Sequence, residues 1–488
     1  MNQRPKQPSI RQVSLLLAVL ACAVVISGGA PANGPGITYT SYEDARPILE
    51  AMREILPAEL RSADATDLPV QWRRWVERRN ADIRARLAQG DEDSLINFLL
   101  FGTSFTSKPR LTIESLAQAG ANSTQPEGGA VSKAMHNRAT DLVQAMASPG
   151  NNERLTFARK LVEGKGYDVR TAAGRARIID YLLAGLARVL SENAGYARVL
   201  ESARLLGDPS AEFAERSKLF GARGLSSDTS LLPNFALEKA LTSIKSQGLL
   251  RQSGVRRVAV IGPGLDFTDK EDGYDFYPQQ TIQPFAIIDT LLRLGLAPAK
   301  EVSVTTFDLS PRVNGHLTAA RNRAVRGIGY VIQLPRNQNS KWSRETTEYW
   351  SRLGDQIGVQ VTPVAVPAGA GDVRVRAVRI RPAVVSAVTP QNVNIVLQRL
   401  DLAAGNEFDL IIATNILVYY DVFEQSLALA NIERMLKPGG FLLSNNALLE
   451  LPGSKMHSIG YETVAYSDRP NDGDHIVWYQ RSADKIDR

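Results

Sequence analysis

From Gly254 onward, short β-branched segments alternate with amphipathic ones, and this alternation limits the fold more than any other feature. The strand-like segments include Arg256–Gly262, Glu301–Leu309, Asn392–Leu402 and Phe408–Leu417, and the helix-like segments include Gln283–Gly295 and Val422–Leu436. Such alternation is typical of a parallel sheet that is covered by helices on both faces. The sequence therefore predicts an α/β fold, a doubly wound Rossmann-like sheet.

The end of the chain breaks the alternation. The segments "YETVAYSD" and "DHIVWYQRS" both have the composition of strands, and only a turn separates them. Two strands joined by a turn pair in antiparallel fashion. We therefore expect the sheet to end in an antiparallel pair.

Three further regions are predicted along the chain. Residues 40–250 have a helical pattern and are interpreted as an all-helical N-terminal domain, followed by the α/β domain at 251–488 with an insertion at about 326–391. Within the insertion, Arg374–Arg381 contains four arginines. They fit an exposed edge strand that is protected by charge, or a basic wall that faces an anionic substrate. The arginine-rich segment Arg73–Arg86 fits a solvated helix face or a contact with an anionic surface.

The first 32 residues have the pattern of a targeting segment. Basic residues precede the uncharged run Val13–Ile26, which is followed by small residues up to Ala32. This pattern indicates a signal peptide cleaved after Ala32, a lipoprotein-like segment modified at Cys22, or an uncleaved membrane anchor. Each of these places the remainder outside the cytosol or at a membrane, with membrane association through this segment; if the segment is not used for export, the protein is cytoplasmic.

Composition argues against several classes of function. A single cysteine excludes an intramolecular disulfide, and the four histidines have no metal-ligand spacing, so no metal site is predicted. The net charge of +6 is small for 488 residues. It does not favour a nucleic-acid partner, because such proteins concentrate positive charge on one face.

Candidate ligand-binding groups follow three predicted strands. Gly262 and Gly264 form a turn in which the backbone can approach a ligand, and Asp308 follows the next strand, where a carboxylate can accept hydrogen bonds from a ribose diol. Asp401 follows the third segment. The first two features fit a dinucleotide or S-adenosylmethionine. Phe267 occupies the third small-residue position of the dinucleotide fingerprint, which argues against NAD.

The fourth strand decides between these ligands. "FDLIIATNILVYY", a helix and then "MLKPGGFLLSNN" resemble class I S-adenosylmethionine-dependent methyltransferases, and most closely the chemoreceptor glutamate methyltransferase-like branch. The resemblance covers about Arg256 to Gln480. It implies seven strands, the last antiparallel, and S-adenosylmethionine as the cofactor.

The resemblance also implies roles for individual residues. The turn at Gly262 and Gly264 would back onto the methionine part of the cofactor, Asp308 would hold the ribose and Asp401 the adenine. Asn415 would lie near the amino-acid end of the cofactor or near the substrate. The implied cofactor set is completed by the neighbouring residues Asp266, Leu309 and Leu400.

The chain departs from the family pattern before its first predicted helix. Val260 stands where the family often has an acid, Asp266 takes the third glycine position, and the loop Phe267–Gln283 is long. Tyr274 and Tyr277 in this loop could close over the site. Candidates for the methyl-transfer site are Asn415, Tyr419, Tyr420 and Asp421.

The acceptor is not identified by the sequence. No Asn-Pro-Pro-Tyr motif of the kind used on planar nitrogens is present, which favours an oxygen or carboxylate acceptor. Export would separate the chain from a cofactor made in the cytosol. Two alternatives therefore stay open: an exported noncatalytic binding module on a methyltransferase scaffold, and an NAD-dependent oxidoreductase.

Overall fold

The computed structural model describes residues 35–111, 130–205, 220–221, 223–266, 274–445, 447–451, 453–469 and 472–483. The predicted targeting segment 1–32 and part of the long loop, 267–273, lie outside these residues. Within the described ranges, none of the helices combines the length and the apolar character needed to span a bilayer.

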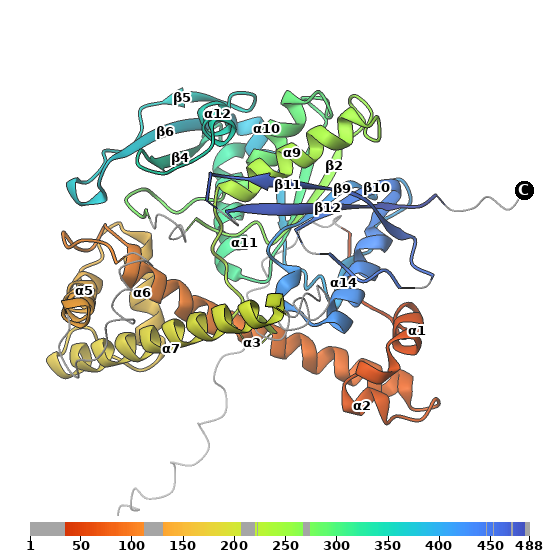
Figure 1. Ribbon diagram of the computed structural model, residues 1–488, viewed down its shortest axis with the longest axis horizontal. Coiled ribbons are helices and arrows are strands. Elements are labelled where there is room, and N and C mark those ends of the chain that lie inside the picture. The colour runs from red at the N-terminus through yellow and green to blue at the C-terminus, as the bar shows by residue number, and fades with distance from the viewer. Residues whose placement is uncertain are drawn as a thin grey trace, which may run out of the picture.

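The centre of the molecule is a seven-stranded sheet (Figure 1). Its strands are β2 (Arg257–Ile261), β3 (Ser303–Phe307), β7 (Val388–Gln391), β9 (Phe408–Ala413), β10 (Leu436–Ser444), β11 (Met456–Ala465) and β12 (Gly473–Arg481). Their spatial order is β11-β12-β10-β9-β2-β3-β7. The last strand, β12, runs antiparallel to both of its neighbours, as predicted. The chain leaves β2 towards β3 and returns to β9 on the other side of β2, so the order reverses between β2 and β9.

The position predicted for the third strand of this sheet is wrong. We expected Asn392–Leu402, but the strand that pairs with β3 is β7, which ends at Gln391. Pro390 lacks a donor and weakened the strand signal, yet an edge strand tolerates it. The apolar run that follows is buried as irregular chain, and β8 (Gln398–Leu400) pairs instead with β1 (Ile37–Tyr39) in a separate two-stranded sheet.

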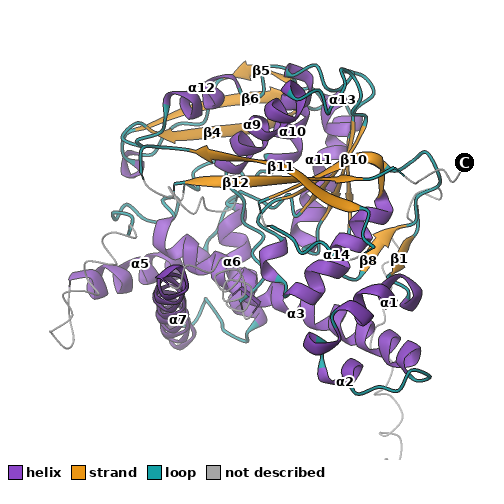
Figure 2. Cartoon of the chain, turned by 45° about the vertical axis from the view of Figure 1, so that its right-hand side comes forward, coloured by secondary structure: helices purple, strands orange, loops and turns teal. Residues whose placement is uncertain are grey.

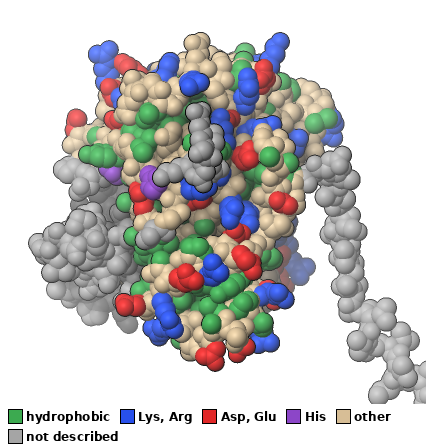
Figure 3. Space-filling view, turned by 90° about the vertical axis from the view of Figure 1, so that its right-hand side faces the viewer, with side chains coloured by type: hydrophobic (Ala, Val, Ile, Leu, Met, Phe, Trp, Pro, Cys, Tyr) green, Lys and Arg blue, Asp and Glu red, His purple; other side chains and the backbone are tan. Residues whose placement is uncertain are grey.

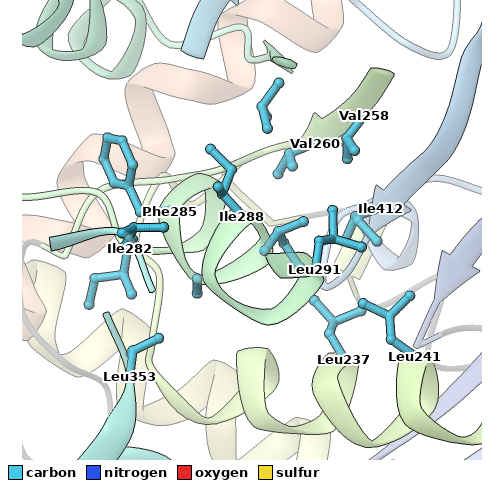
Figure 4. Close-up of a cluster of buried hydrophobic side chains, with 14 of the residues drawn as sticks. Leu237, Leu241, Val258, Val260, Ile282, Phe285, Ile288, Leu291, Leu353 and Ile412 are labelled. Carbon is cyan, nitrogen blue, oxygen red and sulfur yellow. The ribbon is translucent and has the colours of Figure 1, made fainter. Parts of the chain in front are cut away.

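Helices cover both faces of the sheet because strand residues alternate between two cores. Val258 and Val260 of β2 face one core, and Ala259 and Ile261 face the other. The first core is filled by α9 (Leu232–Ser246), α10 (Gln283–Arg293) and α11 (Pro311–Val325). Figure 4 shows the side chains of α9 and α10 directed at β2 and β9. The second core is covered by α14 (Val422–Met435).

The predicted insertion forms a small sheet of its own. It contains β4 (Tyr330–Asn337), α12 (Arg344–Arg352), β5 (Gly358–Val361), β6 (Val373–Ile380) and α13 (Pro382–Ser386). The expected exposed edge strand at Arg374–Arg381 is wrong, because β6 is the central strand of the order β4-β6-β5. The guanidinium groups of Arg374 and Arg376 instead lie over the ring of Trp350, 5.7 and 5.6 Å from its centre.

The N-terminal region consists of helices after β1. They are α1 (Tyr42–Ala51), α2 (Ala58–Arg61), α3 (Leu68–Phe101), α5 (Ala130–Ala147), α6 (Glu153–Gly164) and α7 (Ala172–Leu205). Helix α3 connects two cores: Trp75 and Ile83 pack under the sheet, whereas Phe98 and Leu99 pack among α5, α6 and α7. Figures 1 and 2 show α3 running between the sheet and this helical cluster. On the face in Figure 3, basic and acidic side chains are interspersed.

Candidate functional site

A cavity of about 730 Å³ lies at the carboxyl ends of the strands, where the strand order reverses. This volume is within the range of small-molecule sites, which form at such reversal points in α/β sheets. The strand ends that border it contribute Ile261, Gly262, Phe307, Asp308, Thr414, Asn415, Asn445, Gly473 and Asp474. Within the described part of the chain, no group of three His, Cys, Asp or Glu side chains is placed to hold a metal ion.

The glycine turn at the end of β2 lines this cavity, and its two glycines are required by contacts within the chain. Gly262 has φ +65°, and a Cβ atom there would lie 2.1 Å from Cδ1 of Ile416. Gly264 has φ +63°, and its Cβ atom would lie 2.8 Å from the carbonyl oxygen of Ser227. The backbone of Leu265 donates to that same oxygen at 2.7 Å. The turn is therefore held between the β9 loop and the segment before α9.

Asp308 borders the cavity at the end of β3. One carboxylate oxygen accepts a hydrogen bond from the backbone N–H of Ser310 at 2.8 Å, and Ser310 in turn caps the N-terminus of α11. Burial raises the pKa of Asp308 to about 6, although backbone N–H groups of Ser310 and Gly264 oppose the rise. The side chain is ionised at neutral pH and can accept hydrogen bonds from a ligand.

Asn415 lines the cavity in the segment that follows β9, next to Ile416, which faces the glycine turn. It has φ +59°, a conformation that asparagine adopts more readily than most residues. Its backbone N–H donates to Oδ1 of Asn445 at 2.8 Å, and Nδ2 of Asn445 donates back to Oδ1 of Asn415 at 2.6 Å. This reciprocal pair joins the ends of β9 and β10 at the cavity. Asn445 was not predicted from the sequence.

Tyr419 and Tyr420 both line the cavity. The ring of Tyr419 meets that of Phe220 edge-on, with centres 5.6 Å apart. Burial, with the nearby carboxylate of Glu424 next, raises the pKa of Tyr420, so its hydroxyl stays protonated at neutral pH. Asp421 does not line the cavity: it caps α14 in a reciprocal capping box with Glu424.

Several predicted site residues are not brought together with the others. Leu309 lines the cavity, but Leu400 and Asp401 do not. Asp401 follows β8 rather than a strand of the main sheet, is exposed, and donates its N–H to Gly36. The placement of Asp401 at the end of the third strand was wrong, because that strand is β7.

The long loop also differs from expectation. Asp266 is buried outside the cavity lining, where its carboxylate accepts from Tyr277 at 2.9 Å and from Gln280 at 2.8 Å. Burial raises the pKa of Asp266. Tyr274 and Tyr277 do not cover the cavity; both are buried and pack with Ala370 of the insertion.

The cavity also contains residues that the sequence did not single out. One wall is the polar segment Ser226–Ser230, which precedes α9, and the end near β12 carries Arg469, Asp472 and Asp474. The first group has a visible signal, a run of Ser, Asp and Thr before a helix, but such runs usually cap helices. Their part in the cavity depends on contacts between segments far apart in the chain.

Comparisons with known proteins give distant matches. No family model and no curated protein sequence matches the chain. Among solved structures, the N-methyltransferase NodS from Bradyrhizobium japonicum WM9, in complex with S-adenosyl-L-homocysteine, matches 56% of this chain and 99% of its own at 14% identity and a TM-score of 0.26. The glycopeptide N-methyltransferase MtfA, with the same ligand, matches 56% and 98% at 11% identity and a TM-score of 0.23.

A third match covers more of the chain. MtNAS, in complex with MTA and tNA, matches 73% of this chain and 100% of its own at 11% identity and a TM-score of 0.23. Likenesses at this level carry no argument about activity.

Proposed function

We propose that the chain is a class I S-adenosylmethionine-dependent methyltransferase. The observation that carries the proposal is the sheet order with its reversed last strand, combined with a cavity at the reversal point between β2 and β9. The glycine turn follows β2, and Asp308 follows the adjacent strand β3; both line the cavity. An NAD-dependent reaction is less well supported, because the third position of the dinucleotide fingerprint is Phe267.

Each part of the cofactor has a proposed neighbour in the cavity. Asp308 would accept hydrogen bonds from the ribose hydroxyls, and the Gly262 turn would lie beside the methionine part. Asp401 is not available for the adenine, so we assign the adenine to the apolar surface of Val393 and Ile395, which follow β7 and line the cavity. The pair Asn415–Asn445 would face the amino-acid end or the acceptor.

The reaction requires positioning more than activation. A methyl group moves from the sulfonium to the acceptor by in-line displacement, so the protein has to align the two partners and exclude water. Tyr419 and Asn415 border the space in which an acceptor would lie. Tyr420 is not a base at neutral pH, because burial keeps its hydroxyl protonated.

The charged side chains at the cavity end near β12 indicate which charge an acceptor can carry. Asp472 and Asp474 line this end, with Arg469 as the cation beside them. A carboxylate acceptor would meet like charge there, which disfavours its binding. Of the acceptors that the sequence favoured, we therefore propose a neutral oxygen. The similarity to the chemoreceptor glutamate methyltransferase-like branch stays a prediction from sequence.

Titration calorimetry of the purified protein with S-adenosylmethionine, S-adenosylhomocysteine and NAD tests the proposal. We expect dissociation constants of about 1 μM to 1 mM for the first two ligands, the range in which enzymes usually hold their substrates, and no heat from NAD. Binding of NAD alone would overturn the proposal. Binding of S-adenosylmethionine without methyl transfer to any hydroxyl compound in a screened set would favour the noncatalytic module.

Binding of S-adenosylhomocysteine should depend on pH through Asp308. Its pKa of about 6 means that the carboxylate is ionised above pH 6 and protonated below it. Because ribose hydroxyls donate to the ionised form, affinity should be constant above pH 7 and fall by up to about tenfold per unit below pH 6. Calorimetry from pH 5 to 8 measures this. In Asp308→Asn the decline should disappear; a decline that persists would assign it to another group.

A further inference from the structure

Arg86 of helix α3 connects two segments of the cavity wall, one around Phe220 and Arg223 and the other at Tyr419. Its Nε donates to the carbonyl of Arg223 at 2.9 Å, Nη2 to that of Phe220 at 2.9 Å, and Nη1 to that of Tyr419 at 3.0 Å. The guanidinium thus donates hydrogen bonds to three carbonyl oxygens from two segments that are far apart in sequence. Burial lowers the pKa of Arg86. The predicted solvated face of Arg73–Arg86 is therefore wrong at this residue.

The same helix meets this wall through direct backbone contact. A Cβ atom on Gly90 would lie 1.9 Å from the carbonyl oxygen of Leu225, and one on Gly224 would lie 2.3 Å from the backbone nitrogen of Gly90. The N–H of Leu225 also donates to the carbonyl of Arg86 at 3.1 Å. Two glycines on facing segments, with φ outside the left-handed region, indicate that close approach of the two backbones is the reason for glycine at both positions.

The wall fixed in this way belongs to the cavity. The cavity is lined here by Leu87, Phe220, Leu225 and Tyr419. The rings of Phe220 and Tyr419 meet edge-on and so connect the two segments. Phe307 and Asp308 at the end of β3 line the same cavity. The helical N-terminal region therefore contributes to the cavity that also contains the carboxylate assigned to the ribose.

We propose that Arg86 is a positioning residue, and that through it the N-terminal helices form part of the cofactor site. This inference depends on the proposed function, because it assumes that the cavity binds S-adenosylhomocysteine. A planar guanidinium can donate in three directions, whereas a lysine ammonium on a flexible stem cannot replace it at such a site. Without Arg86, the Phe220 and Tyr419 segments lose their common partner and the wall moves.

The test compares Arg86→Ala and Arg86→Lys with the unaltered protein by calorimetry with S-adenosylhomocysteine. We expect both variants to bind about tenfold more weakly or worse, because a wall displaced by about 1 Å no longer packs on the ligand. Methylguanidinium at millimolar concentration should restore affinity to Arg86→Ala and leave Arg86→Lys unchanged. The lysine variant keeps the charge and the aliphatic stem, so it provides a folded comparison.

Arg78→Ala is the matched control. Arg78 lies on the same helix, is exposed, and pairs with Glu59 outside the cavity, so its loss should leave affinity unchanged. Equal affinity in the unaltered protein and in both Arg86 variants would overturn the inference. So would a loss of affinity in Arg86→Ala that methylguanidinium does not restore. If the unaltered protein fails to bind the ligand, the proposed function itself fails, which is a distinct result.

Discussion

Replacing Asp308 with alanine should weaken binding of S-adenosylhomocysteine by about 1.5–3 kcal/mol, the usual loss when hydrogen bonds to a charged group are removed. Asp308 lies at the end of β3, beside the glycine turn, and is the carboxylate that we assign to the ribose. At pH 7.5 it is ionised, because its pKa is about 6. The side chain also accepts from Ser310, so part of any effect could come from the start of α11.

Two comparisons separate these contributions. Asp308→Asn keeps an acceptor for Ser310 but removes the charge, so it should retain the melting temperature while it loses most of the affinity. Asp401→Ala serves as the control, because sequence resemblance gave Asp401 a cofactor role and the structure places it outside the cavity. Calorimetry should show normal binding in Asp401→Ala. The reverse outcome, with normal binding in Asp308→Ala and weak binding in Asp401→Ala, would contradict the proposed site.

The sequence was sufficient where local pattern and packing agree. Val258–Ile261 and Leu410–Ala413 are runs of apolar residues that are buried on both faces of the sheet, and such runs already indicate a buried strand in the sequence. The glycine turn was also found, since two glycines after a strand indicate an unusual backbone. Its immediate cause, the contacts with Ile416 and Ser227, could not be read from the turn alone.

The sequence failed where edge strands and distant contacts decide the structure. β7 contains Pro390 and only four residues, whereas the more apolar segment after it looked more like a strand. This one-element error put the predicted adenine contact at Asp401, whereas it is the chain after β7 that lines the cavity. Arg86 was likewise assigned to solvent, because nothing in an arginine-rich helix indicates that one guanidinium will meet carbonyls from Phe220 and Tyr419.

The largest effect on folding is expected for Gly262→Ala. Alanine at φ +65° costs about 1–2 kcal/mol in backbone strain. Its Cβ atom would also lie 2.1 Å from Cδ1 of Ile416, and overpacking of this kind typically costs a further 1–3 kcal/mol. We therefore expect the free energy of unfolding to fall by about 2–5 kcal/mol, measured by urea denaturation.

Gly295→Ala measures the backbone strain without a clash, and a double mutant measures the contact between residue 262 and Ile416. Gly295 has the same φ of +65°, but nothing lies within 4 Å of its Cβ position, so this variant should lose only the strain energy of about 1–2 kcal/mol. Adding Ile416→Ala to Gly262→Ala removes the clashing atoms, and the coupling energy between the two changes should be favourable by about 1–3 kcal/mol. Independent effects of the two substitutions would show that Ile416 is free to move away. The close approach would then not explain the glycine, and its positive φ would remain the reason for it.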